Sequence, residues 1–133
     1  MTYEPRIGCG AAILSNDKLL LIQRRGEPEA GHWGFPGGKV DWLEPVPEAV
    51  VREVREELGI ELTDLQLLTA VDQIDSQAPA HWVALVYLTD AFTGQPRLME
   101  PEKHIDFGWF SLDELPEPLT TATRMALPSL LSR

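Results

Sequence analysis

The chain has 133 residues, of which 44% are hydrophobic and 24% are charged, and its formal net charge is −10. This length predicts a single domain, residues 1–133, with a core of its own. No apolar run reaches the ~18 residues that span a membrane, and the first residues lack the pattern of a signal peptide. An acidic chain without a basic cluster is not typical of proteins that bind the backbone of a nucleic-acid polymer.

The first two strands are predicted on either side of a turn. Arg6 to Leu14 becomes apolar as a buried strand does, Ser15 to Asp17 is a turn signal, and Lys18 to Arg24 is the returning strand. The one cysteine, Cys9, lies in the first of these strands, so neither an internal disulfide nor a cysteine-based zinc site can form. We expect Cys9 to pack as a small core residue and the protein to be cytoplasmic.

A glycine-rich loop then leads into a short helix. The paired glycines Gly37 and Gly38 permit backbone to approach a metal or a phosphate closely. Pro47 suits the first helical position and Gly59 suits the position just past a C-terminus, so the helix is predicted from Pro47 to Leu58. At about 100° per residue, its apolar residues form one stripe, which consists of Val50, Val51, Val54 and Leu58.

The second half of the chain has the signals of further strands and a terminal helix. Strands are predicted at residues 65–74, 81–88 and 107–111, with a polar loop at 75–79 and a charged loop from Glu100 to His104. The tail from Thr120 to Leu131 has a helical apolar pattern, which Pro128 would kink or end. Strands combined with one central and one terminal helix predict an α/β (α+β) domain whose sheet is covered on both faces.

Carboxylates gather on the predicted central helix. Glu53, Glu56 and Glu57 fall on a stripe beside the apolar one, with Arg52 at its edge, and the preceding loop delivers a fourth carboxylate, Glu44. A charged helix face is usually solvated, and Arg52 with Glu56 makes an ordinary i,i+4 pair. However, like charges spaced as Glu53 and Glu57 are repel one another unless a cation neutralises them. Grouped oxygen ligands suit Mg²⁺ or Mn²⁺.

The spacing of these residues resembles the Nudix box at every defining position. Five residues separate Gly38 from Glu44, and seven residues separate Glu44 from the run from Arg52 to Ile60, REVREELGI. The resemblance implies a Nudix hydrolase, which cleaves a nucleoside diphosphate linked to another moiety. It also implies an α/β/α sandwich with a mixed central sheet, and a short helical turn at residues 112–116. Family members often have Gly directly before the first Glu, where this chain has Trp42-Leu43.

The resemblance also implies roles for the carboxylates of the box. Glu56 and Glu57 would be the main metal ligands, and Glu53 would be a further ligand or the general base. Arg52 would orient Glu53 rather than touch the substrate. Glu44 would act through a metal-bound water or by supporting the ligands from outside.

Residues in neighbouring loops complete the expected site. A backbone carbonyl of Gly37-Gly38 would join the metal ligands, and a late-loop carboxylate often does so in this family, for which Glu102 is the candidate together with Glu100. Trp33 and Phe35 could stack on a nucleotide base, although large aromatic side chains are more often part of a core. The histidines are not spaced as a metal site, so His32, His81 and His104 are expected at the surface or in hydrogen bonds.

The substrate is harder to predict. Some Nudix subfamilies are marked by Pro or Tyr about fifteen residues past the box, where this chain has Asp75 and Ser76. The chain most resembles the nucleoside triphosphate pyrophosphohydrolases of the family, which share its compact length and its Glu-Pro-x-Lys run at residues 100–103. This resemblance favours a nucleoside triphosphate, cleaved to monophosphate and pyrophosphate. The alternatives are an ADP-ribose or nucleotide-sugar hydrolase and a catalytically silent nucleotide-sensing module. The expected partners are a small nucleotide and a second copy of the chain in a homodimer, with no nucleic-acid polymer and no membrane.

Overall fold

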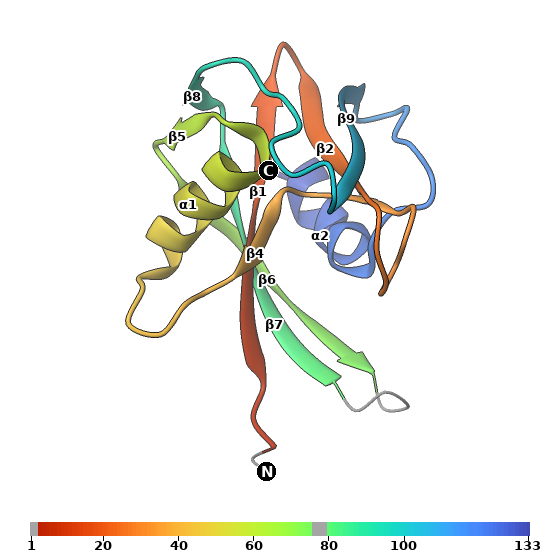
Figure 1. The fold of residues 1–133 in the computed structure, drawn as a ribbon. Helices are drawn as coiled ribbons and strands as arrows, with labels where there is room; N and C mark the ends of the chain where they lie inside the picture. The colour runs from red at the N-terminus through yellow and green to blue at the C-terminus, as the bar shows by residue number, and fades with distance from the viewer. Residues whose placement is uncertain (1–2, 76–79) are drawn as a thin grey trace.

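A computed structural model describes residues 3–75 and 80–133, which form a mixed β-sheet with one helix on each face (Figure 1). The main sheet contains β1 (Arg6–Ser15), β2 (Lys18–Arg24), β3 (Trp33–Gly34), β4 (Gly37–Lys39), β6 (Gln66–Asp75), β7 (Ala80–Thr89) and β9 (His104–Ser111). The helices are α1 (Val46–Leu58) and α2 (Thr121–Leu131), and β5 (Glu61–Thr63) pairs with β8 (Ala91–Thr93) in a separate small sheet. The expected α/β/α sandwich with a mixed sheet is confirmed.

Strand β1 is the centre of the main sheet, and its two edges are paired differently. On one edge it runs parallel to β7 along its length, from Arg6 opposite Trp82 to Ile13 opposite Thr89. On the other edge, β2 pairs with β1 only near the connecting turn, and β4 pairs with the stretch from Gly8 to Gly10. The divergence of β2 therefore leaves room for the glycines of β4 in the middle of the sheet.

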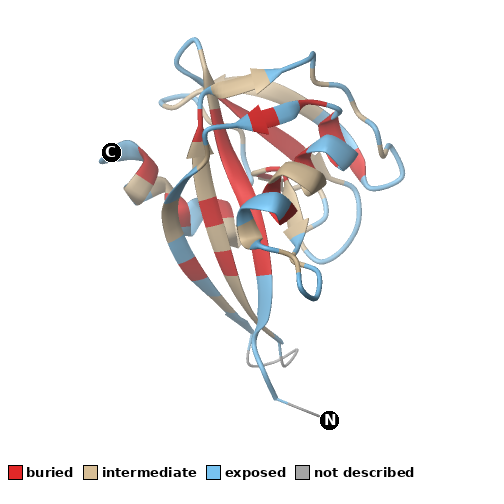
Figure 2. Ribbon diagram, turned by 90° about the vertical axis from the view of Figure 1, so that its left-hand side faces the viewer, coloured by how far each residue is buried: buried red, intermediate tan, exposed pale blue. Residues whose placement is uncertain are grey.

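The two helices cover two separate apolar clusters. Alternate residues of β2 point to opposite faces of the sheet, so Leu20 and Ile22 pack under α1 while Leu19 and Leu21 pack under α2. Figure 2 shows the resulting buried bands on the sheet and on the inner side of α1. Of the predicted helix stripe, Val50, Val54 and Leu58 are fully buried and Val51 is half-buried.

The ends of α1 follow the sequence signals. Pro45 is the N-cap residue, and the helix begins at Val46, so that Pro47 lies in its first turn. Gly59 adopts the left-handed conformation, with φ 71°, and its N–H donates to the carbonyl of Arg55. The predicted helix from Pro47 to Leu58 is thus confirmed to within one residue.

Other predicted elements were shorter, longer or absent. The hairpin turn is confirmed by the positive φ of Asn16 and Asp17, but the last strand begins at His104 instead of Phe107. Residues 112–116 were expected to form a helical turn, and instead Glu114 N–H donates to the carbonyl of Ser111 in a simple turn. Helix α2 does not end at Pro128, one of the two expected outcomes, but continues to Leu131. Most of the predicted polar loop, residues 76–79, lies outside the described residues.

Neither described helix is both long enough and apolar enough to cross a lipid bilayer within residues 3–75 and 80–133.

Candidate active site

The inner side of α1 places two of its carboxylates directly over the glycines of β4. The N–H of Gly37 donates to Oε1 of Glu57 at 2.9 Å. A Cβ atom at Gly38 would collide with the carboxylate of Glu53, so only glycine leaves room for this side chain in its present place. The structure therefore brings the predicted loop and helix residues together in one site.

Glu57 is a buried carboxylate, and its side chain is only 9% exposed. Burial is the main cause that raises its pKa to about 8, and the negative charges of Glu53 and Glu100 raise it further. The hydrogen bond from Gly37 and the positive charge of Lys103 act in the opposite direction. Burial likewise raises the pKa of Glu53, against the hydrogen bond from Arg52. Glu53 thus has a guanidinium partner, whereas the hydrogen bond that Glu57 accepts comes from a neutral backbone N–H.

Arg52 forms hydrogen bonds with three carboxylates of the box, those of Glu44, Glu53 and Glu56. Its guanidinium donates to both oxygens of Glu44 at 2.7 and 2.9 Å, to Glu53 at 2.9 Å and to Glu56 at 3.1 Å. It also donates to the backbone carbonyl of Lys39 at 3.0 Å. The hydrogen bonds from Arg52 hold the pKa of Glu44 at about 2. This geometry suits an arginine that orients carboxylates and does not itself reach the substrate.

The donor atoms of the site fit a hard divalent cation. Within the described ranges, no three carboxylate, imidazole or thiol groups already converge as a complete metal site. The oxygens near the glycine pair are nevertheless those that Mg²⁺ and Mn²⁺ prefer, from Glu53, Glu57 and backbone carbonyls. A divalent cation would also supply the opposite charge that the buried carboxylate of Glu57 lacks, and so favour its ionised form. By donor chemistry and charge, the residues fit such an ion.

The charged loop before β9 contains two glutamates, and the charge of one of them, Glu100, acts on the buried carboxylate of Glu57. Glu100 is mostly buried, raises the pKa of Glu57 and forms an ion pair with Lys103 at 3.4 Å. Glu102 is exposed, and its charge acts on His104. This placement favours Glu100 as the late-loop carboxylate, and a metal-ligand role for Glu102 stays a prediction.

His104 is a site residue that the sequence did not single out. Its side chain is 8% exposed, and Nε2 lies 3.9 Å from Oε2 of Glu57. Burial is the main cause that lowers its pKa, so the ring is neutral at pH 7. From the sequence His104 was the last residue of the predicted charged loop, and the start of β9 at this residue is a finding of the structure.

A pocket of about 550 Å³ adjoins the two glycines of β4. Phe35, Gly37 and Gly38 are part of its lining, and contact of Phe35 and Gly37 with a substrate stays a prediction. The lining residues that the sequence analysis did not select include Arg6, Arg24, Lys39, Gln73, Trp82 and Thr123. The guanidinium of Arg6 lies over the ring of Trp82, 5.6 Å from its centroid. The pocket therefore combines aromatic rings with positive charge.

Trp33 lies apart from this lining. Its ring packs edge-on against Phe110, with centroids 5.1 Å apart and planes inclined at 74°, within the cluster under α2. The placement favours Phe35 over Trp33 as the residue that contacts a substrate.

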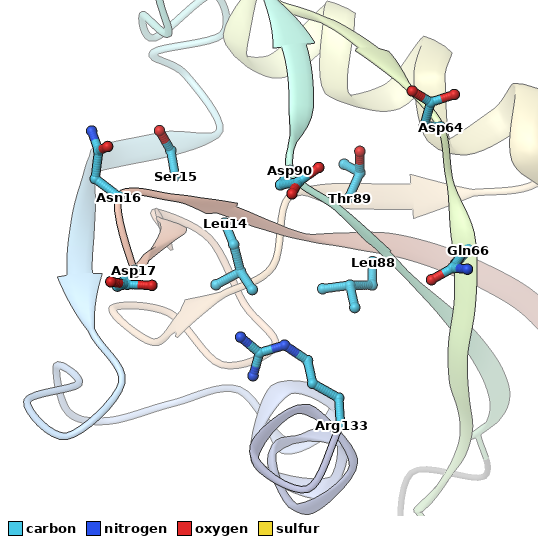
Figure 3. Close-up of a pocket in the computed structure, with 10 residues that line it drawn as sticks. All are labelled: Leu14, Ser15, Asn16, Asp17, Asp64, Gln66, Leu88, Thr89, Asp90 and Arg133. Carbon is cyan, nitrogen blue, oxygen red and sulfur yellow. The ribbon is translucent and has the colours of Figure 1, made fainter.

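A second pocket, of about 510 Å³, lies where β1 turns into β2 (Figure 3). Asp17, Asp64 and Asp90 line it, and Arg133 reaches it from the end of α2. None of the carboxylates of the box contributes to its lining. The first pocket, in contrast, is lined by Gly37 and Gly38, which lie against the carboxylates of Glu57 and Glu53, so it is the one of these two pockets that adjoins the acidic site.

The loop between β4 and α1 carries the departure from the usual box. Leu43, which occupies the usual glycine position, has a φ of 68° and is 85% exposed. Its neighbours hold it there, because the N–H of Asp41 donates to Glu44 Oε1 and the N–H of Glu44 donates to the carbonyl of Asp41, both at 3.0 Å. The loop thus keeps a glycine-like path with a leucine in it.

Leu43→Gly is expected to stabilise the protein by up to ~1.5 kcal/mol. The left-handed conformation costs a leucine about 1–2 kcal/mol, whereas the greater flexibility of an unfolded glycine costs ~0.5–1 kcal/mol. The exposed leucine loses little packing on removal. Urea unfolding measures the difference, with Trp42→Ala as the control at an adjacent, 89% exposed position. A loss of stability in the glycine variant would show that the leucine side chain stabilises the loop.

The metal-free protein is expected to lose stability as the pH rises from about 5 to 8. The pKa of Glu57 is about 8 in the folded protein, against an ordinary value of 4.5, so in this window the folded state binds more protons than the unfolded state. Melting temperatures in excess chelator at pH 6 and 8 measure the effect. In Glu57→Gln the decrease should be clearly smaller. An equal decrease in the variant would mean that the carboxyl group of Glu57 is not its source.

Comparison with known proteins identifies the family. A model of the NUDIX domain matches residues 4–130. An ADP-ribose pyrophosphatase of Methanocaldococcus jannaschii is 33% identical over 114 residues, which cover 86% of this chain and 66% of that protein. A CTP pyrophosphohydrolase of Escherichia coli is 54% identical over 55 residues, which cover 40% of this chain and 41% of that protein. The chain thus spans less than two-thirds of the length of these curated relatives.

Solved structures agree with the family model. A MutT NUDIX hydrolase from Burkholderia pseudomallei is 59% identical, with a TM-score of 0.94 over 96% of this chain and 98% of that one. The solution structure of the E. coli ORF135 protein is 28% identical, with a TM-score of 0.81 over 97% and 90% of the two chains. The match of the family model to nearly the whole length, together with these likenesses, shows that the chain belongs to the Nudix hydrolase family.

Proposed function

We propose that this chain is a single-domain, metal-dependent pyrophosphohydrolase that cleaves a (deoxy)nucleoside triphosphate to a monophosphate and pyrophosphate. The observation that carries the proposal is the position of the β4 glycines. Gly37 and Gly38 line the pocket of about 550 Å³ and also lie against the carboxylates of Glu57 and Glu53. A nucleotide in the pocket would therefore have its phosphate chain beside the acidic site.

The pocket has the chemistry to hold the two ends of such a substrate. Arg24 and Lys39 offer positive charge to phosphate oxygens. Phe35 and Trp82 offer aromatic faces to a base, and stacking of this kind tolerates different bases. We therefore expect several nucleotides to be hydrolysed, with discrimination of about 1–3 kcal/mol from each contact.

The residues of the box have different roles in the proposed reaction, namely metal binding, positioning and proton transfer. A divalent cation held by Glu57 and Glu56 would neutralise charge on the phosphoryl oxygens and lower the pKa of a bound water. The N–H of Gly37 keeps the carboxylate of Glu57 in place. Arg52 orients Glu53, whose raised pKa makes it a stronger proton acceptor and therefore the candidate general base.

Hydrolysis of ADP-ribose is the second candidate. It is favoured by the relative from M. jannaschii, which is named an ADP-ribose pyrophosphatase and matches 86% of this chain. A silent nucleotide-binding module is disfavoured, because all the carboxylates of the box are present. The homodimer expected from the sequence stays a prediction.

A panel of nucleoside triphosphates, ADP-ribose and nucleotide sugars, each with Mg²⁺, tests the proposal. Hydrolysis in ¹⁸O-labelled water with mass spectrometry of the products shows which phosphorus is attacked. We expect monophosphate and intact pyrophosphate, and no turnover in excess chelator. Glu57→Gln, purified in parallel, controls for contaminating phosphatases. Release of orthophosphate, or much faster turnover of ADP-ribose, would contradict the proposed substrate, and full activity in chelator would contradict the metal.

A further inference from the structure

A small cavity of about 70 Å³ adjoins the carboxylate of Glu57. Its polar lining comes from Glu57, His104, Arg24 and Thr120. A single water needs roughly 10–15 Å³ of such space and two or more polar partners. The cavity is thus both large enough and polar enough to hold ordered water next to Glu57.

The two ring nitrogens of His104 differ in their surroundings, and it is Nε2 that faces Glu57. Its Nδ1 is buried and has no hydrogen-bond partner among the described residues. A buried ring nitrogen without a partner costs about 1–3 kcal/mol. The distance of 3.9 Å between Nε2 and Oε2 of Glu57 is too long for a direct hydrogen bond and short enough for a bridging water. Since Gly37 donates to Oε1, a bridge to Oε2 would engage the second oxygen of the carboxylate.

The backbone of His104 ties it to the late loop. Its N–H donates to the carbonyl of Glu100 at 3.1 Å, and its Cα lies opposite Arg24 in the pairing of β9 with β2. The backbone of His104 is therefore anchored to the sheet on one side and to the loop that carries Glu100 on the other. Because the side chain is also buried, the ring has little room to turn away from Glu57.

We propose that His104, together with water in the adjoining cavity, is a positioning residue that holds the carboxylate of Glu57 ready for a divalent cation. This inference rests on the proposed metal-dependent function, and it assigns His104 no contact with the substrate. The alternative is that His104 only fills space under the late loop. The two readings differ in whether the hydrogen-bonding capacity of the side chain matters, or only its volume.

Binding of Mn²⁺ alone, followed by the electron paramagnetic resonance signal of the free ion, separates these readings. His104→Leu fills the space without polar atoms and is expected to weaken Mn²⁺ binding about 10- to 100-fold, as loss of a supporting partner does. His104→Gln keeps a donor and an acceptor and should stay within about threefold of the wild type. His104→Phe replaces the leucine variant if that does not fold. His81→Leu is the matched control, because His81 is exposed and bonds to Asp72.

Wild-type Mn²⁺ affinity in the folded leucine or phenylalanine variant would overturn the proposal. Equal losses in the leucine and glutamine variants would also overturn it, because volume alone would then explain them. The kinetics add a second readout, since a positioning residue should lower kcat with Mg²⁺ and leave the KM of the nucleotide unchanged. If the wild type binds Mn²⁺ and the variants follow the expected order, but no triphosphate is hydrolysed, the proposed substrate fails while the role of His104 stands.

Discussion

Glu57→Gln is expected to lower kcat with Mg²⁺ by about 10³-fold or more and to leave the fold intact. The amide keeps the shape of the side chain and an oxygen for the N–H of Gly37, but it removes the charge that would bind the cation. Loss of a supporting partner typically costs 10- to 100-fold, and a direct ligand should cost more. Stopped assays over a wide range of enzyme concentration, with melting curves on the same samples, measure both quantities.

The two glutamates of the late loop provide a matched control for this prediction. Glu100→Gln removes a charge that acts on Glu57 and is expected to lower kcat about 10-fold. Glu102→Gln changes an exposed carboxylate and is expected to have a smaller effect. Near-normal turnover in Glu57→Gln would contradict its assignment as a main ligand. A larger loss in the Glu102 variant than in the Glu100 variant would restore Glu102 as the late-loop ligand.

Gly37→Ala is expected to destabilise the fold by about 3 kcal/mol, at the upper end of the range for overpacking. The new Cβ would collide with the backbone carbonyl of Cys9 in β1, and β1 cannot retreat because its other edge is paired with β7. In Gly38→Ala the collision is with the carboxylate of Glu53, at the end of a flexible side chain. That variant should therefore remain stable and lose turnover instead.

Urea unfolding of the two glycine variants measures this difference. Gly26→Ala is the control, because a Cβ there would have no atom within 4 Å. If Gly37→Ala unfolds at the same urea concentration as Gly26→Ala, the close approach of β4 to β1 is not a constraint on the fold. If Gly38→Ala keeps full turnover, the position of Glu53 over that glycine is not needed for the reaction.

The parts of the fold that depend on neighbours in sequence could be predicted. Helix α1 is framed by Pro47 and Gly59, whose effects act within one turn, and the hairpin at Asn16 and Asp17 is equally local. The four short strands β3, β4, β5 and β8 could not be predicted. Each has only two or three residues, which is too few for a periodic pattern, and each exists because a distant segment offers it a partner.

The site was predictable in its chemistry but less so in its geometry. Glu57 follows Val50 by seven residues and Val54 by three, so it lies along the buried stripe, which was the available signal for its burial. What covers it, the N–H of Gly37 and the ring of His104, comes from other elements. Trp82 was missed for the same reason, because its place in the pocket follows from the pairing of β7 with β1.

The central pairing of β1 with β7 has a consequence for the order of folding. Arg6 lies opposite Trp82 and Ile13 opposite Thr89, so the longest pairing of the first strand joins segments that are far apart in the chain. Such non-local contacts require closure of a long loop and slow the folding step. During synthesis, α1 can form as soon as its residues are available, but β1 has only two paired positions with β2 and a short pairing with β4 until β7 appears. Gly37 and Gly38, which contact Glu57 and Glu53, are in β4, and β4 pairs with β1. We therefore expect the metal site to form only after β7 has paired with β1, although the helix that carries its carboxylates can form earlier.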